Sequence, residues 1–241
     1  MTASTRIRPP LVGLGLVTVA FLAYALPPYL GLDPARSRVP TRSGTWFHYP
    51  LLVTHIFLGT AVLVTAVLQL WPWLRQRHPK VHRWSGRLYV FAAIPAGLAA
   101  LAVAPLGAAG LNQRAANTML ALLWLGTTVA GYVTARRRRY AQHREWMVRS
   151  FALCFSIVVN RLWTTVCVAV FVPDPSDAVA LQQAIGVGTW MSWLVNLLIA
   201  EWWLQHTRHR RKTRRATLSS PVPAGTWGAD PRPTPPGSPT G

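Results

Sequence analysis

The sequence predicts an all-α fold, a polytopic integral membrane bundle of about six transmembrane helices whose main partner is the lipid bilayer. Three observations predict this fold class. Of the 241 residues, 51% are hydrophobic and only 13% are charged, whereas soluble domains usually carry about 25% charged residues. Apolar stretches of roughly 20 residues, long enough to cross a bilayer, recur six times. The basic residues gather between these stretches rather than within them.

The first apolar stretch follows Arg6 and Arg8, as the apolar core of a signal peptide would. It is longer than the about 7–15 residues of such a core, and more apolar stretches follow it. We therefore expect an uncleaved first helix that is broken at its far end by Pro27 and Pro28. In chain order, the six expected spans cover residues 11–32, 47–73, 88–109, 115–135, 148–172 and 181–204.

The chain is expected to have three segments. Residues 1–10 form a short cytoplasmic N-terminus, and residues 11–207 form the transmembrane domain. Residues 208–241 begin with a basic run and continue as a tail rich in Pro, Gly, Ser and Thr. Because this tail has too few apolar side chains to form a core, we expect it to be disordered.

The formal net charge of +19 is distributed unevenly between the expected connections. Basic residues crowd into alternate connections and the C-terminal segment, whereas the other connections hold only Arg36, Arg38, Arg42 and Arg114. Cytoplasmic connections carry the excess of Lys and Arg in membrane proteins. The sequence therefore predicts a multi-pass protein of the cell membrane with both termini in the cytoplasm.

The same distribution argues against nucleic acid as a partner. A nucleic-acid-binding protein gathers its basic residues on one folded face, but here they lie near the ends of the spans, where anionic lipid headgroups attract them. The sequence also has no P-loop and no G-x-S-x-G, H-E-x-x-H or C-x-x-C motif. No enzyme class follows from it.

Two histidines in or beside the expected spans are followed by glycine four residues later. These pairs are His55 with Gly59 and His82 with Gly86. A glycine one helical turn from a histidine leaves room for a planar macrocycle bound to the imidazole, and it equally permits close packing of two helices. Both interpretations remain open.

A third histidine, His143, begins the fifth expected span, and His82 lies at the same, cytoplasmic, end of the third. If these two helices are neighbours, His82 and His143 can ligate one metal ion or haem iron from opposite sides. In the alternative interpretation, both are interfacial histidines beside lipid headgroups. Spacing alone does not decide between them.

His55 and Arg161 lie at similar depth within the second and fifth expected spans. An arginine at that depth costs about 2.5–3.5 kcal/mol on insertion scales, so we expect it to face the bundle interior and to find an acceptor. No Asp or Glu lies at that depth. A backbone carbonyl, Asn160, Asn196 or an anionic ligand is then required, such as a haem propionate, a quinone oxygen or a lipid phosphate. A structural role for Arg161 is equally compatible.

Three other reactive residues have simpler interpretations. Glu201 is the only acid in the last expected span, and we expect it to pair with an arginine near the membrane surface rather than to relay protons. Cys154 and Cys167 are thirteen residues apart on one expected helix, so they point to different faces and do not form a disulfide.

The sequence resembles the bacterial predicted membrane proteins of domain of unknown function 2306. The resemblance covers about residues 48–163, and it rests on HIFLGTAVLVTAVLQL from His55, HPKVHRWSGRLYV, AQHREWMVRSFAL and NRLW. This family has no agreed activity, so the resemblance implies a helical membrane protein.

More loosely, the sequence is similar to the cytochrome b561 and ferric-reductase group, in which four core helices each donate a histidine and hold two haem b groups. His55, His82 and His143 match three of the four positions, and the fourth expected span has no histidine. This resemblance implies a single haem b, with His82 and His143 as the iron ligands.

The leading hypothesis is therefore a membrane redox protein that carries electrons through one haem b, with His55 and Arg161 beside a quinone or other ligand. The alternative is a non-redox binder or transporter of a small molecule. A third hypothesis is a structural or assembly subunit whose basic segments bind lipid or a protein partner. The sequence identifies no electron partner and no oligomeric state.

Overall fold

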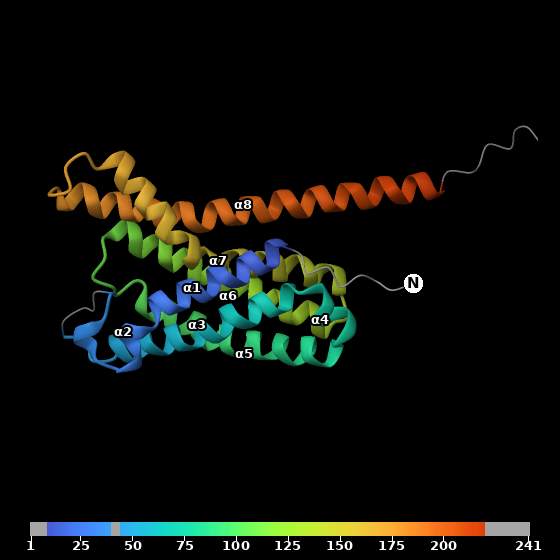
Figure 1. Ribbon diagram of the computed structural model, residues 1–241, viewed down its shortest axis with the longest axis horizontal. Coiled ribbons are helices and arrows are strands. Elements are labelled where there is room, and N and C mark those ends of the chain that lie inside the picture. The colour runs from blue at the N-terminus through green and yellow to red at the C-terminus, as the bar shows by residue number, and fades with distance from the viewer. Residues whose placement is uncertain (1–8, 40–43, 220–241) are drawn as a thin grey trace, which may run out of the picture. The chain divides into compact units, whose positions relative to one another are not determined.

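Every regular element is helical in residues 9–39 and 44–219, which the computed structural model describes (Figure 1). A proline stands at the first position of α2, α4 and α5, where its missing N–H has no intrahelical partner to lose. The elements are α1 (Pro9–Ala25), α2 (Pro27–Leu30), a short 3₁₀ helix η1 (Pro34–Arg36), α3 (His48–Leu70), α4 (Pro72–Arg77), α5 (Pro79–Val103), α6 (Leu111–Arg136), α7 (Tyr140–Phe171) and α8 (Ala178–Ser219).

Five of these helices are long and apolar enough to cross a membrane: α3, α5, α6, α7 and the first part of α8. The predicted fold class, a polytopic helical membrane protein, is confirmed. Six spans were expected, and the difference is α1, an apolar helix of only 17 residues. Its rise of about 25 Å is shorter than a hydrocarbon core of about 30 Å. The chain breaks after it at the predicted place, since α2 begins at Pro27.

Two helices begin well before the spans expected from hydropathy. α5 begins at Pro79 rather than residue 88, and α7 begins at Tyr140 rather than residue 148. Hydropathy detects the apolar part of a helix, whereas a helix continues into basic sequence until its backbone is broken. Between α6 and α7 the break lies at Arg138, whose φ of 58° is left-handed. His82 and His143 are therefore both inside helices.

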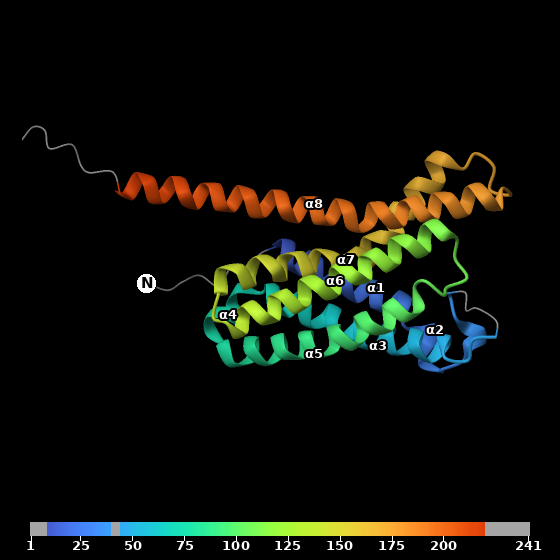
Figure 2. The ribbon, with the colours of Figure 1, turned by 180° about the vertical axis from the view of Figure 1, so that it is seen from behind.

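α3, α5, α6 and α7 lie alongside one another (Figures 1 and 2), and their contacts close a ring around the main core. α3 contacts α5 and α7, and α6 also contacts α5 and α7, so α5 and α7 occupy opposite corners and run in the same direction. The core between them contains Val62, Ala66, Tyr89, Ala93, Ala96, Trp124 and Leu153. We call the end where residues 71–78 and 137–139 connect the helices the basic end. α1 contacts α3 and α7 from outside the ring.

The described residues up to Trp203 form one compact unit, which includes the first part of α8. This part of α8 packs closely on α6 and α7 through glycines: a Cβ at Gly188 would lie 2.7 Å from Thr164 Cα, and one at Gly186 would lie 2.7 Å from Asn112 Nδ2. Two side-chain hydrogen bonds add to this contact, from Trp190 Nε1 to Asn112 Oδ1 (2.9 Å) and from Asn196 Nδ2 to Ala152 O (3.1 Å).

A second unit begins at Leu204. Its described part continues α8 to Ser219, so the basic run expected from residue 208 is helical there. Most of the tail expected to be disordered, residues 220–241, lies outside the described residues, as do residues 1–8 of the expected N-terminal segment.

Candidate functional site

A cavity of about 330 Å³ lies in the half of the bundle away from the basic end. Residues of α1, α2, α3, α5, α6 and α7 form its walls, and most of them are apolar. Among the described residues, its lining contains two arginines and a histidine and no carboxylate. Its principal polar side chains are Arg38, His55, Thr60, Asn117 and Arg161.

His55 is oriented by a hydrogen bond to α5. Its Nδ1 donates a hydrogen bond to the Ala96 carbonyl at 2.9 Å. Because a carbonyl only accepts, Nδ1 carries a proton, and in the neutral ring the lone pair is then on Nε2. One turn along α3, Gly59 also lines the cavity, and a Cβ placed there would meet no atom within 4 Å. The room that the macrocycle interpretation of the His-x-x-x-Gly motif requires is therefore present at His55.

Arg161 lines the same cavity as His55, but it does not face a closed interior as expected. Its side chain is exposed and also lines a groove of about 540 Å³ between α1 and α7. The guanidinium makes no hydrogen bond or ion pair with any residue that the structure describes. The Asn196 amide, one of the acceptors considered for it, donates to Ala152 O instead.

Arg38 brings a second positive charge to the cavity. Its Nη1 donates to Tyr24 O at 2.6 Å, and its guanidinium lies 4.1 Å from the centroid of the Tyr24 ring. The hydrogen bond and the cation–π contact hold the arginine at the end of α1. Sequence reasoning assigned Arg38 only to an outer connection, and no signal in the sequence distinguishes it from Arg36.

The cavity wall at Trp124 connects to a buried polar network across the ring. Trp124 Nε1 donates to Tyr89 Oη (3.4 Å), and Tyr89 Oη, Ser150 Oγ and Thr128 Oγ1 are linked by two contacts of 2.7 Å. Thr128 Oγ1 donates to Trp124 O (2.7 Å). Only one proton order then satisfies every group: Tyr89 donates to Ser150, and Ser150 donates to Thr128. The network is complete, which favours a single arrangement of α5, α6 and α7.

His82 of α5 and His143 of α7 lie nearer the basic end, at matching positions of two helices that run in the same direction. Each lies seven residues before one partner of the Tyr89–Ser150 contact, and residues seven apart share a helical face. Since α5 and α7 run in the same direction, the two imidazoles lie about two turns from that contact and are close enough to interact electrostatically. His143 Nδ1 donates to Gly131 O at 2.8 Å, which leaves its Nε2 as the acceptor.

The room expected beside His82 is filled by a side chain from α3. A Cβ at Gly86 would lie 3.5 Å from Gln69 Nε2. The same amide donates to His82 O (2.8 Å) and Ser85 Oγ (2.6 Å). At this motif, the glycine therefore allows α3 and α5 to pack closely. His82 Nδ1 is buried without a hydrogen-bond partner among the described residues.

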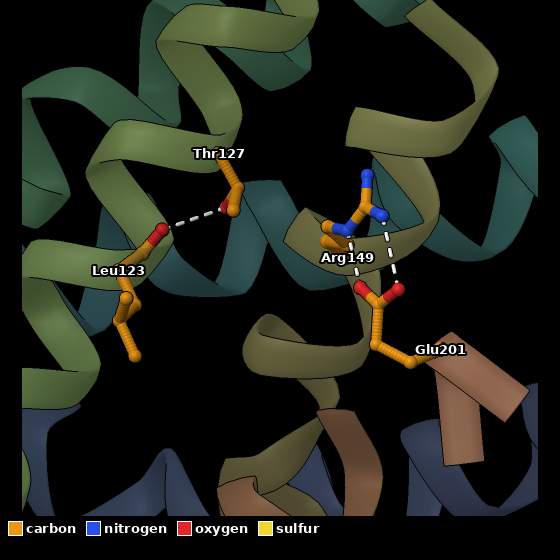
Figure 3. Close-up of polar contacts among 4 residues, drawn as sticks. All are labelled: Leu123, Thr127, Arg149 and Glu201. Carbon is orange, nitrogen blue, oxygen red and sulfur yellow. Dashed lines mark hydrogen bonds and ion pairs between the residues drawn. The ribbon is translucent and has the colours of Figure 1, made fainter. Parts of the chain in front are cut away.

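Glu201 pairs with Arg149 of α7, as predicted (Figure 3). Arg149 Nε bonds Oε1 of the carboxylate, and Nη2 bonds Oε2 at 3.0 Å. The two side chains are 18% and 33% exposed. Figure 3 also shows a hydrogen bond within α6, in which Thr127 Oγ1 donates to Leu123 O (2.8 Å). Cys154 and Cys167 are free thiols, as predicted.

A comparison with protein families places residues 52–204 within one of them, described as "Predicted membrane protein (DUF2306)". The match extends beyond the expected limit near residue 163 and includes the first part of α8. No curated protein and no solved structure matches the chain significantly. The looser resemblance to haem proteins thus gains no support from these comparisons. The chain belongs to the DUF2306 family of predicted membrane proteins.

Proposed function

We propose that this membrane protein binds a small amphiphilic molecule in the cavity lined by His55, Arg38 and Arg161. The observation that carries the proposal is that two guanidinium groups line a cavity of about 330 Å³ whose other walls are largely apolar. This volume falls within the usual range for small-molecule sites, about 300–1,000 Å³. The geometry therefore favours a non-redox binder or transporter over the haem hypothesis.

The chemistry of the lining defines what such a molecule requires. Arg161 supplies hydrogen-bond donors and a positive charge, so an anionic or electron-rich oxygen complements it. The neutral His55 ring offers a lone pair at Nε2 to a hydroxyl donor. The remaining lining complements an apolar body, and a quinone or a lipid-like molecule meets these requirements.

Binding is tested by filling the cavity. Gly59→Leu places a side chain in the open space of the cavity, and Gly126→Leu is the matched control, since its Cβ also meets no atom within 4 Å and Gly126 does not line the cavity. A panel of amphiphiles is added to the purified proteins, and thermal unfolding is followed. A ligand of this cavity raises the Tm of the wild type and of Gly126→Leu but not of Gly59→Leu. Equal shifts in all three proteins contradict the proposal.

We also propose that the protein lies in the cell membrane with its basic end in the cytoplasm, since cytoplasmic connections carry the excess of Lys and Arg. The cavity then lies in the outer half of the bundle. In a chain without its native cysteines, Ser37→Cys should react with an impermeant maleimide in intact cells. Gln142→Cys, near the start of α7, should react only after permeabilisation. The reverse pattern contradicts this orientation.

A second candidate function, electron transfer through one haem b, is supported by the matching positions of His82 and His143 on α5 and α7. His143 fits an iron ligand, because its Nδ1–H is held by the Gly131 carbonyl and its Nε2 keeps a lone pair. His82 also fits, since its buried Nδ1 has no partner among the described residues. The macrocycle fits less well, because Gln69 fills the space at Gly86. A bound haem would supply one-electron chemistry.

The haem proposal is tested by an absorption spectrum of protein purified after haem-sufficient expression. A Soret band that is lost in both His82→Ala and His143→Ala supports ligation by this pair, with His206→Ala as the control. Gln69→Ala should increase haem occupancy, because it empties the space at Gly86. The absence of a Soret band in the wild type and in Gln69→Ala overturns the proposal.

A further inference from the structure

Resting on the proposed function, we propose that the ligand is a single-chain anionic lipid and that it enters the cavity sideways from the bilayer. The entrance is the groove between α1 and α7, which we call the lateral groove. It is lined by Val17, Phe21 and Tyr24 on α1 and by Val158, Thr164 and Thr165 on α7, with Arg161 among them. The headgroup binds Arg161, and the acyl chain lies in the cavity.

The lateral groove and the cavity meet at two shared residues. Phe21 and Arg161 line both the lateral groove and the cavity. A molecule at Arg161 is therefore at the boundary between them. Val17, which lines the groove, is an exposed apolar side chain on a helix of a membrane protein. Such side chains face acyl chains rather than water, so the lateral groove opens towards lipid.

The charge of the lining favours an anionic headgroup. Arg161 lies ten residues before Phe171, the end of α7, which is about 15 Å along the helix axis. A guanidinium at that depth needs an anionic or hydrogen-bonding partner, and none of the described residues supplies one. Arg38 adds a second positive charge, and the described lining contains no carboxylate. A carboxylate or phosphate headgroup complements this charge, and it can accept two hydrogen bonds from one guanidinium.

The size of the cavity favours a single acyl chain. A volume of about 330 Å³ lies at the lower end of the usual range for small-molecule sites, about 300–1,000 Å³. A cavity at this end of the range favours one acyl chain of moderate length over two. The open space at Gly59 lies within this volume. The cavity therefore fits a single-chain lipid better than a two-chain phospholipid.

Specificity is measured with the full-length protein in phosphatidylcholine nanodiscs, using labelled dodecanoate and dodecyl phosphate against dodecanol and inorganic phosphate. We expect both anionic lipids to bind about tenfold more tightly than dodecanol, because the charge-assisted hydrogen bonds are lost with the neutral headgroup. Arg161→Gln should lower dodecanoate affinity to a similar extent, and Arg161→Lys, which keeps the charge, should lower it less. Inorganic phosphate should not bind.

Entry is measured as the association rate of dodecanoate. Val158→Trp narrows the lateral groove without touching the cavity, so it should slow association several-fold relative to Val166→Trp. Val166 is an exposed residue of α7 that does not line the groove, which makes it the matched control. Equal rates in these two variants overturn lateral entry.

The two proposals fail in different ways. If no amphiphile binds the wild type more tightly than Gly59→Leu, the proposed function itself is wrong. Suppose instead that binding depends on Gly59, but dodecanol binds as tightly as dodecanoate or Arg161→Gln keeps full affinity. The cavity then binds amphiphiles, and the proposed specificity for anionic lipids is wrong. If inorganic phosphate binds with the same affinity as dodecyl phosphate, the site binds a free anion and the proposal of a lipid ligand is wrong.

Discussion

Tyr89 on α5 and Ser150 on α7 are joined by a hydrogen bond of 2.7 Å across the four-helix ring. The contact connects two helices at opposite corners, and Trp124 and Thr128 of α6 complete it from the side. Every polar group in the network has a partner only when the hydroxyl protons are arranged in one order. The network therefore favours one arrangement of α5, α6 and α7. The packing of the cavity wall at Trp124 depends on it as well.

Removal of the Tyr89 hydroxyl should destabilise the protein. Tyr89→Phe leaves Trp124 Nε1 without its acceptor and Ser150 without its donor, and a hydrogen bond within a membrane bundle contributes about 0.6–1.7 kcal/mol. We expect unfolding in detergent to become easier by about 1 kcal/mol. Tyr140→Phe, at an exposed side chain, is the control and should have no effect. Equal stability of the two variants would show that the network contributes little.

The Arg149–Glu201 ion pair should contribute a measurable coupling between α7 and α8. Because the ion pair is bidentate and partly buried, it should contribute more to the free energy of unfolding than an ordinary surface ion pair does. In a double-mutant cycle with Arg149→Gln and Glu201→Gln, we expect a coupling of about 1 kcal/mol in the free energy of unfolding. The charge-reversed pair, Arg149→Glu with Glu201→Arg, should recover part of the loss. A coupling near zero contradicts this prediction.

Gly188 should tolerate no side chain. A Cβ there would lie 2.7 Å from Thr164 Cα and 2.8 Å from Thr164 N, and backbone atoms cannot move aside as a flexible side chain can. Gly188→Ala should therefore cost about 1–3 kcal/mol through overpacking. Gly126→Ala, where the added carbon has open space, should be neutral or slightly stabilising. Thermal unfolding of both variants provides the comparison.

The connection between α7 and α8 should respond to acid. The Asp174 carboxylate accepts hydrogen bonds from Ser176 N (2.9 Å) and Ser176 Oγ (2.8 Å), and these bonds lower the pKa of Asp174. A lowered pKa means that the bonds stabilise the connection above the ordinary aspartate pKa and that this stabilisation is lost as the pH falls through the lowered value.

Removing one of these bonds should raise the Asp174 pKa. In Ser176→Ala the hydroxyl bond is gone and the backbone bond remains, so we expect the pKa to move part of the way towards its ordinary value. An NMR titration of the Asp174 carboxyl carbon measures it. Ser37→Ala is the control, since that hydroxyl donates to Val39 O instead. An unchanged Asp174 pKa in Ser176→Ala contradicts the prediction.

The membrane fold could be predicted because hydropathy records which helix segments face lipid. Helix ends could not be predicted in the same way. His82 stands outside the expected third span and inside α5, because helix continues from Pro79 through sequence that is too polar to score as a span. The Glu201–arginine pair could be predicted, since a lone acid near several arginines has few other partners.

The polar network and the Gln69 contact could not be predicted, because they depend on which helices are neighbours. Tyr89 and Ser150 lie on the helical faces of His82 and His143, but only the ring arrangement brings them together. Gln69 fills the space at Gly86 because α3 packs on α5 there. Arg161 faces a groove rather than a closed interior because α1 lies beside α7, and no pattern in either helix records that contact.

The walls of the cavity come from two different parts of the chain. His55, Trp124 and Arg161 fall within the part that matches the family, which begins at residue 52. The wall formed by Phe21, Tyr29 and Arg38 precedes that part. Substitutions at Phe21 and Arg38 can therefore change the size of the cavity and its second positive charge without altering the family-matched part, whereas Tyr29 also packs on Leu52 and Val53 of α3. The proposed function therefore allows ligand preference to change through the N-terminal segment, with no substitution in the family-matched part.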